Sequence, residues 1–159
     1  MRILIKIFIF LFLIFFISEN SFYAQQNPSS AAKALKVKMK SMFIYQFAKN
    51  VYWPKAYTTG DFTIGIYGSE DLYNLLNTSF KDKMNGSQKI KFDFYESASE
   101  ISDCHLLFVS GEEKESMASV QKVLNDKTLL VTEGKDLATT GSMINFVYVQ
   151  NRLKFQINK

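Results

Sequence analysis

The stretch Cys104-His105-Leu106-Leu107-Phe108-Val109-Ser110 decides the fold. Four consecutive apolar residues between polar flanks are typical of a strand that is covered on both faces, as in the middle of a parallel sheet. Residues 62–67 form an earlier apolar run, and Gly68-Ser69-Glu70-Asp71 after it opens a helix that continues through Phe80. Strands that alternate with helices in this way predict a parallel sheet.

The rest of the chain continues the alternation. The apolar residues of segment 31–52 recur at helical spacing, and that helix must end before Trp53, which precedes Pro54. Further elements are predicted as a turn at Asn85-Gly86, strands over 90–94 near a sheet edge and over 129–131, a helix over 112–124, and a hairpin of 143–149 with 153–157. We therefore expect one α/β domain over residues 31–159, with a three-layer, mostly parallel sheet flanked by helices and ending in an antiparallel hairpin.

The first residues are typical of a secretory signal peptide. Arg2 and Lys6 precede an apolar run over 7–17, which is shorter than the roughly 20 residues that cross a bilayer. Cleavage after Ala24 is expected, and residues 25–30 are expected to be a flexible spacer. This arrangement predicts export to the periplasm, with an uncleaved membrane anchor as the alternative.

Charge and cysteine content exclude several classes of protein. The net charge of +4 is spread along the chain, which does not indicate nucleic-acid binding. Cys104 is the sole cysteine, so no internal disulfide can form. No glycine-rich phosphate loop is present, and no cofactor is predicted.

Four acidic side chains near the ends of predicted strands could in principle gather at one edge of the sheet, and an active site of a parallel sheet is sought at such an edge. The carboxylates in question are Asp103, Glu112, Glu113 and Glu133. An acid and base pair would need two of them together, and nothing in the spacing places them so. We therefore expect these carboxylates to cap helices or to lie on the solvated surface, and we expect the protein not to be an enzyme.

Cys104 and His105 are the one place where a thiol meets an imidazole. Neighbouring strand residues point to opposite faces, so the two cannot readily share a metal or act as nucleophile and base. His105 is also the chain's only histidine, whereas zinc takes three or four protein ligands. We expect a packed thiol beside a histidine that forms hydrogen bonds at a strand end, and no metal site.

Two features of the first helix could serve binding. Tyr45, Tyr52, Trp53 and Tyr57 could line a pocket for a ligand or partner, with core packing as the alternative. The early turns carry a basic stripe that could face a membrane, although a solvated outer face is favoured; its members are Lys33, Lys36, Lys38 and Lys40.

Six segments, in order along the chain, resemble the YfiR-like family of periplasmic proteins. The first is Met42-Phe43-Ile44-Tyr45-Gln46-Phe47-Ala48-Lys49-Asn50-Val51-Tyr52-Trp53-Pro54. The others are 62–68, 104–110, 130–134, 141–146 and 152–158. Family members commonly continue into a further helix and often contain disulfides, whereas this sequence ends at Lys159 and has one cysteine.

The resemblance implies a non-enzymatic, homodimeric regulator that binds the periplasmic domain of an inner-membrane signalling protein. For this family the partner is a diguanylate cyclase, whose repression lowers cyclic-di-GMP and biofilm formation; a sensor kinase is the other candidate. Three hypotheses follow, in this order: such a regulator, a periplasmic small-molecule-binding sensor with a pocket near Tyr45, Trp53 and Thr132 to Gly134, and an enzyme that uses Glu133. The residues predicted to contact a partner or ligand are Tyr45, Lys49, Tyr52, Trp53, Glu133 and Gly134.

Overall fold

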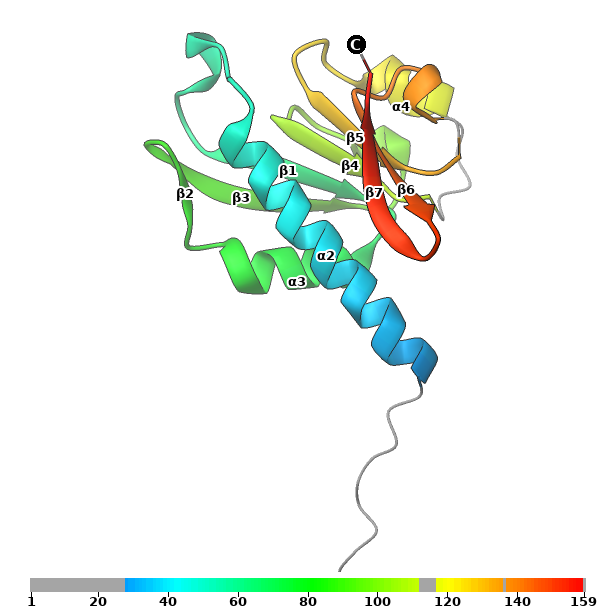
Figure 1. Cartoon of the computed structure of the whole chain (residues 1–159). Helices are drawn as coiled ribbons and strands as arrows, with labels where there is room; N and C mark the ends of the chain where they lie inside the picture. The colour runs from blue at the N-terminus through cyan, green and yellow to red at the C-terminus, as the bar shows by residue number, and fades with distance from the viewer. Residues whose placement is uncertain (1–27, 112–116, 136, 159) are drawn as a thin grey trace, which may run out of the picture. The chain divides into compact units, whose positions relative to one another are not determined.

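The computed structural model describes residues 28–111, 117–135 and 137–158 (Figure 1). The predicted signal peptide, residues 1–24, lies outside the described residues. Within the described ranges, no helix is both long enough and apolar enough to cross a membrane. The first described helix, α2 (Pro28–Asn50), takes in the last three residues of the predicted spacer. Proline is well tolerated in a first helical turn, which is consistent with a helix that begins at Pro28.

A seven-stranded sheet runs in the order β2-β3-β1-β4-β5-β6-β7. All neighbouring pairs from β3 to β6 are parallel, and the outer pairs β2·β3 and β6·β7 are antiparallel. This confirms the mostly parallel sheet with a closing hairpin. The strands are β1 (Phe62–Tyr67), β2 (Met84–Asn85), β3 (Gln88–Tyr95), β4 (Leu106–Val109), β5 (Leu129–Glu133), β6 (Ile144–Val149) and β7 (Arg152–Ile157).

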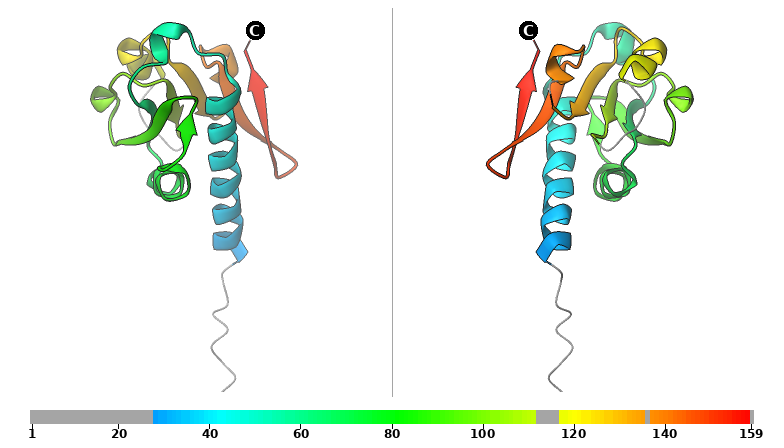
Figure 2. Two further views of the ribbon diagram at one scale, coloured as in Figure 1. Left: turned by 90° about the vertical axis from the view of Figure 1, so that its left-hand side faces the viewer. Right: turned by 90° about the vertical axis from the view of Figure 1, so that its right-hand side faces the viewer.

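Helices cover both faces of the sheet (Figure 2). One face packs against α2 and α3 (Glu70–Phe80), and the other packs against α4 (Met117–Val123) and the short helix η2 (Ala98–Glu100). The first five residues of the predicted helix 112–124 lie outside the described part. The remaining short helices are η1 (Lys55–Tyr57) and η3 (Leu137–Thr139).

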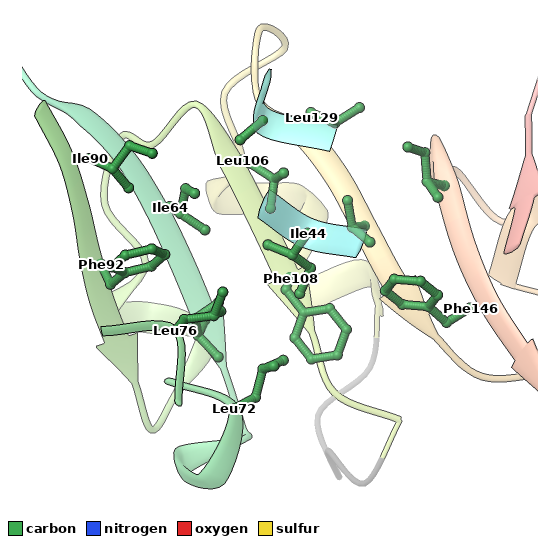
Figure 3. Close-up of a cluster of buried hydrophobic side chains, with 14 of the residues drawn as sticks. Ile44, Ile64, Leu72, Leu76, Ile90, Phe92, Leu106, Phe108, Leu129 and Phe146 are labelled. Atoms are coloured by element: carbon green, nitrogen blue, oxygen red, sulfur yellow. The ribbon is translucent and has the colours of Figure 1, made fainter. Parts of the chain in front are cut away.

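Strand β4 is the central strand that its apolar run predicts, because all four residues are buried. Leu106 and Phe108 point into the core under α2 and α3, where Ile44 of α2 lies among them (Figure 3). Leu107 and Val109 point into the opposite core. Burial of large apolar side chains on both faces contributes roughly 1.5–3 kcal/mol each, so this strand anchors both layers.

A buried polar network joins β5 and β6 to the loop between them. The hydroxyl of Thr132 lies 2.8 Å from the Ser142 hydroxyl and 2.9 Å from Oδ1 of Asn145, and all three side chains are fully buried. The Asn145 amide donates to the carbonyl of Gly134 at 2.8 Å. Because buried polar groups are costly unless paired, this network determines the position of the Gly134 turn.

Candidate functional site

Glu133, at the carboxyl end of β5, forms an ion pair with a lysine of α2. Its Oε2 lies 2.7 Å from Nζ of Lys40, and the two side chains are only 17% and 10% exposed respectively. The Lys40 ammonium also lies 5.8 Å from the ring centroid of Phe108. The prediction that Lys40 belongs to a solvated outer face is therefore wrong, because Lys40 projects between the helix and the sheet.

Two more side chains complete the surroundings of Glu133. Burial, together with the charge of Glu133 and a hydrogen bond to it, raises the pKa of Tyr148 to about 12. The Lys36 ammonium lies 4.7 Å from the centroid of the Tyr148 ring. Tyr148 is therefore a phenol that stays protonated at neutral pH, and Glu133 is held by a cation and a hydroxyl.

The carboxylates considered for acid and base catalysis do not meet among the described residues. Asp103 precedes β4 and lies at the amino edge of the sheet, whereas Glu133 ends β5 at the carboxyl edge. Glu112 and Glu113 lie outside the described part. The structure therefore supplies Glu133 with a lysine and a phenol, and it places Asp103 at the other edge of the sheet.

Two hollows flank the turn Glu133-Gly134-Lys135, which lines both. One, of about 260 Å³, is completed by residues 146–148 of β6. The other, of about 250 Å³, is completed by 109–111 after β4, with Met117 and Leu137. Glu133 and Gly134 thus lie at the carboxyl edge of the sheet, which is the edge where the ligands of parallel sheets usually bind.

The loop after β4 approaches this turn closely. A Cβ on Gly111 would lie 2.3 Å from the carbonyl oxygen of Glu133, so only glycine fits there without a backbone shift. The order of the parallel strands reverses at β1, whose neighbours are β3 and β4. Ligands of doubly wound sheets bind near such a reversal.

The aromatic residues before β1 lie at the opposite edge. Trp53 packs edge-on against Phe62 with 5.0 Å between ring centroids, and its Nε1 donates to the carbonyl of Ala48 at 2.9 Å. Tyr45 stacks on Phe80 at 4.4 Å. Both rings therefore pack the first helix onto the rest of the domain. This is the core packing that the sequence suggested as the alternative to a binding pocket.

Lys49 and Tyr52 are the exposed members of the same group. The Lys49 ammonium donates to the carbonyl of Met84 at 3.1 Å, and Tyr52 is 86% exposed. The structure thus brings Tyr45, Lys49, Tyr52 and Trp53 to one end of α2. It does not bring Glu133 and Gly134 next to them, because those two lie at the other edge of the sheet.

His105 and Cys104 are arranged as the strand pattern predicts. Backbone Thr63 N–H donates to Nδ1 of His105 at 3.1 Å, and Nε2 lies 3.0 Å from the Tyr57 carbonyl oxygen. Cys104 is buried in the opposite core, and burial raises its pKa to about 12. A thiol with so high a pKa is a poor nucleophile. Among the described residues, no three histidine, cysteine or acidic side chains lie close enough to hold a metal ion.

An exposed apolar strip on β7 was not predicted. Phe155 is 40% exposed and Ile157 is 61% exposed. They are two positions apart in β7, so both side chains lie on the same face of the strand, which α2 covers only in part. The rings of Phe43 and Phe47 meet Phe155 edge-on at 5.6 and 5.2 Å. Period-two alternation in 153–157 is the sequence signal that could have identified this surface.

Comparison with known protein families gives a match over most of the chain. The family model described as YfiR/HmsC-like covers residues 37–159, which includes all seven strands and most of α2. None of the curated proteins matches the chain at a significant level.

Proposed function

Since this chain belongs to the YfiR/HmsC-like family, we propose that it is a periplasmic regulatory protein that acts by protein contact and has no catalytic activity of its own. Its partner is the periplasmic domain of an inner-membrane signalling protein. A diguanylate cyclase is the first choice, and its repression lowers cyclic-di-GMP and biofilm formation. The observation that carries the proposal is the family match over residues 37–159.

The surroundings of Glu133 support a role without catalysis. Its carboxylate is engaged by Lys40 at 2.7 Å and by the Tyr148 phenol, whose pKa of about 12 keeps its proton in place. A general base needs a free carboxylate within reach of the proton that it removes. Glu133 is better suited to holding α2 on the sheet.

The end of α2 is our choice for the contact surface. Tyr52 is 86% exposed, and Lys49 lies three residues before it, in the last turn of α2. Aromatic and cationic side chains carry much of the energy of protein interfaces. Tyr45 and Trp53 hold this end of the helix in position through their packing on Phe80 and Phe62.

The proposal is tested by measuring intracellular cyclic-di-GMP in the source bacterium after deletion of the gene. We expect a rise that is reversed by the wild-type gene. Complementation with Tyr52→Ala should fail to reverse it, whereas Met42→Ala, a matched change at a 55% exposed position on the outer side of α2, should succeed. An unchanged nucleotide level in the deletion strain would refute repression of a cyclase.

A second candidate function is a small-molecule sensor that feeds a membrane-bound sensor kinase. The hollows of about 260 and 250 Å³ beside Glu133 favour it. Trp53 lies at the opposite edge of the sheet, so its fluorescence is a poor reporter for a ligand there. Calorimetric titration of a metabolite panel is the better test, with Glu133→Gln expected to abolish any binding. Flat titrations across the panel would refute this candidate.

A further inference from the structure

The hydrogen bonds of His105 admit one protonation state. An amide N–H can only donate, so Nδ1, which faces the Thr63 amide at 3.1 Å, must accept and carries no proton. A carbonyl oxygen can only accept, so Nε2, at 3.0 Å from the Tyr57 carbonyl, must carry the proton. The ring is therefore neutral, with its proton on Nε2.

The imidazole joins the connection between α2 and β1 to the sheet. Through Tyr57 it holds η1, and through Thr63 it holds β1. Its ring stacks on Phe62 at 4.4 Å and meets Trp53 and Tyr57 edge-on at 5.9 and 5.8 Å. The polar and aromatic contacts of this connection thus converge on one titratable side chain.

A second proton would break this arrangement. It would have to sit on Nδ1, where it would point at the Thr63 N–H, so that one hydrogen bond becomes a contact between two donors. Partial burial opposes the charge as well and lowers the pKa of His105.

Few other groups face the ring. Before β4 the facing group is the Asp103 carboxylate, and before β5 it is the Lys127 ammonium; both line a hollow of about 360 Å³ beside His105. Cys104 also borders this hollow, but its thiol lies in the opposite core, where burial raises its pKa to about 12 and keeps it neutral. Lys127 lies 5.4 Å from the centroid of the Tyr57 ring. From η1 the facing group is Tyr57. Phe62 and Thr63 of β1 and Trp53, in the connection after α2, also face the ring, and none of these three side chains titrates.

We infer that His105 is a pH-sensitive clip: neutral, it holds segment 53–57 against the amino edge of the sheet, and protonated, it releases that segment. The released segment carries the Trp53 indole and adjoins the exposed Tyr52 ring, so acid changes the aromatic surface at the end of α2. This inference goes beyond the proposed function and does not depend on which partner the protein has.

The direction of the effect follows from linkage. With the pKa lower in the closed form than the usual value of about 6.5, the open form binds more protons between the two values. The clip is therefore fully effective above about pH 6.5 and weakens as the pH falls through the closed-state pKa. For each pKa unit by which the closed form lies below the open form, the equilibrium constant for opening of the clip increases about tenfold once His105 is protonated in both forms.

The test uses the chain's only tryptophan and only histidine. In the full chain between pH 8 and 5, the nitrogen resonances of His105 give its tautomer and midpoint, and Trp53 emission reports the segment. We expect an Nε2–H tautomer at pH 8, a midpoint below 6.5, and a change in emission with that same midpoint. The change should persist in Asp103→Asn and disappear in His105→Gln.

In the wild-type chain, any of three results would overturn the clip: an Nδ1–H tautomer, a His105 midpoint at or above pH 6.5, or Trp53 emission that stays flat while His105 titrates. Persistence of the emission change in folded His105→Gln would do the same. If that variant does not fold, the two wild-type titrations decide alone, because coincidence of their midpoints is required.

Discussion

Replacing Lys40 with methionine tests whether the Lys40–Glu133 pair holds α2 on the sheet. Methionine keeps the apolar stem of the lysine but leaves the Glu133 carboxylate, 17% exposed, without its cation. Removing one partner of a fully buried pair costs about 3–5 kcal/mol. Since both side chains keep some contact with water and the Tyr148 phenol remains beside Glu133, we expect a loss of about 2–3 kcal/mol.

Urea unfolding followed by circular dichroism at pH 7 measures this loss. The control is Lys38→Met, a change of the same chemistry at an exposed position of α2, for which we expect a change within about 0.5 kcal/mol. In the double variant with Glu133→Gln, the loss should fall short of the sum of the single losses by more than about 1 kcal/mol. Equal losses for the two lysines, or coupling below about 0.5 kcal/mol, would refute the role given to the pair.

Three further predictions concern the core and its edges. Thr132→Val should cost about 1–3 kcal/mol of unfolding free energy in urea titrations because it leaves the buried Oδ1 of Asn145 without its donor at 2.9 Å, whereas Thr132→Ser should cost less; equal losses would count against the network. Gly111→Ala should lower the urea midpoint by an amount equivalent to about 1–3 kcal/mol, because its Cβ would lie 2.3 Å from the carbonyl oxygen of Glu133, and an unchanged midpoint would contradict the close approach. Cys104 should react with iodoacetamide at pH 8 far more slowly in the folded chain than in urea, since burial raises its pKa to about 12; equal rates would contradict its burial.

The strands of the sheet could be predicted where an apolar run or an alternating pattern extends over several residues. The unbroken run 106–109 predicted a central strand, and the structure places it between β1 and β5 with both faces covered. Strand β2 was missed because its two residues are too few to show alternation. The Asn85-Gly86 turn signal next to it was nevertheless correct, since Gly86 has a φ of 60° in the turn between β2 and β3.

Lys40 is a residue whose charge suggested exposure although its helical spacing places it on the buried face of α2. It lies four residues before Ile44, which is fully buried, so helical spacing places both on the same face. Its charge nevertheless suggested solvent, because no partner was visible nearby. Glu133 is 93 positions away, and only the fold brings the two together.

The separation of the predicted site residues follows from the order of elements in a parallel sheet. A residue that precedes a strand lies at the amino edge, and one that ends a strand lies at the carboxyl edge. Trp53 comes before β1 and Glu133 ends β5, so no single pocket can include both. The helix α2 reaches both edges, since Lys40 binds Glu133 at one and Ala48 accepts from Trp53 at the other. A change at either edge can therefore affect the other through the position of α2, and the fully buried side chain of Ile44, between these contacts, resists such a movement.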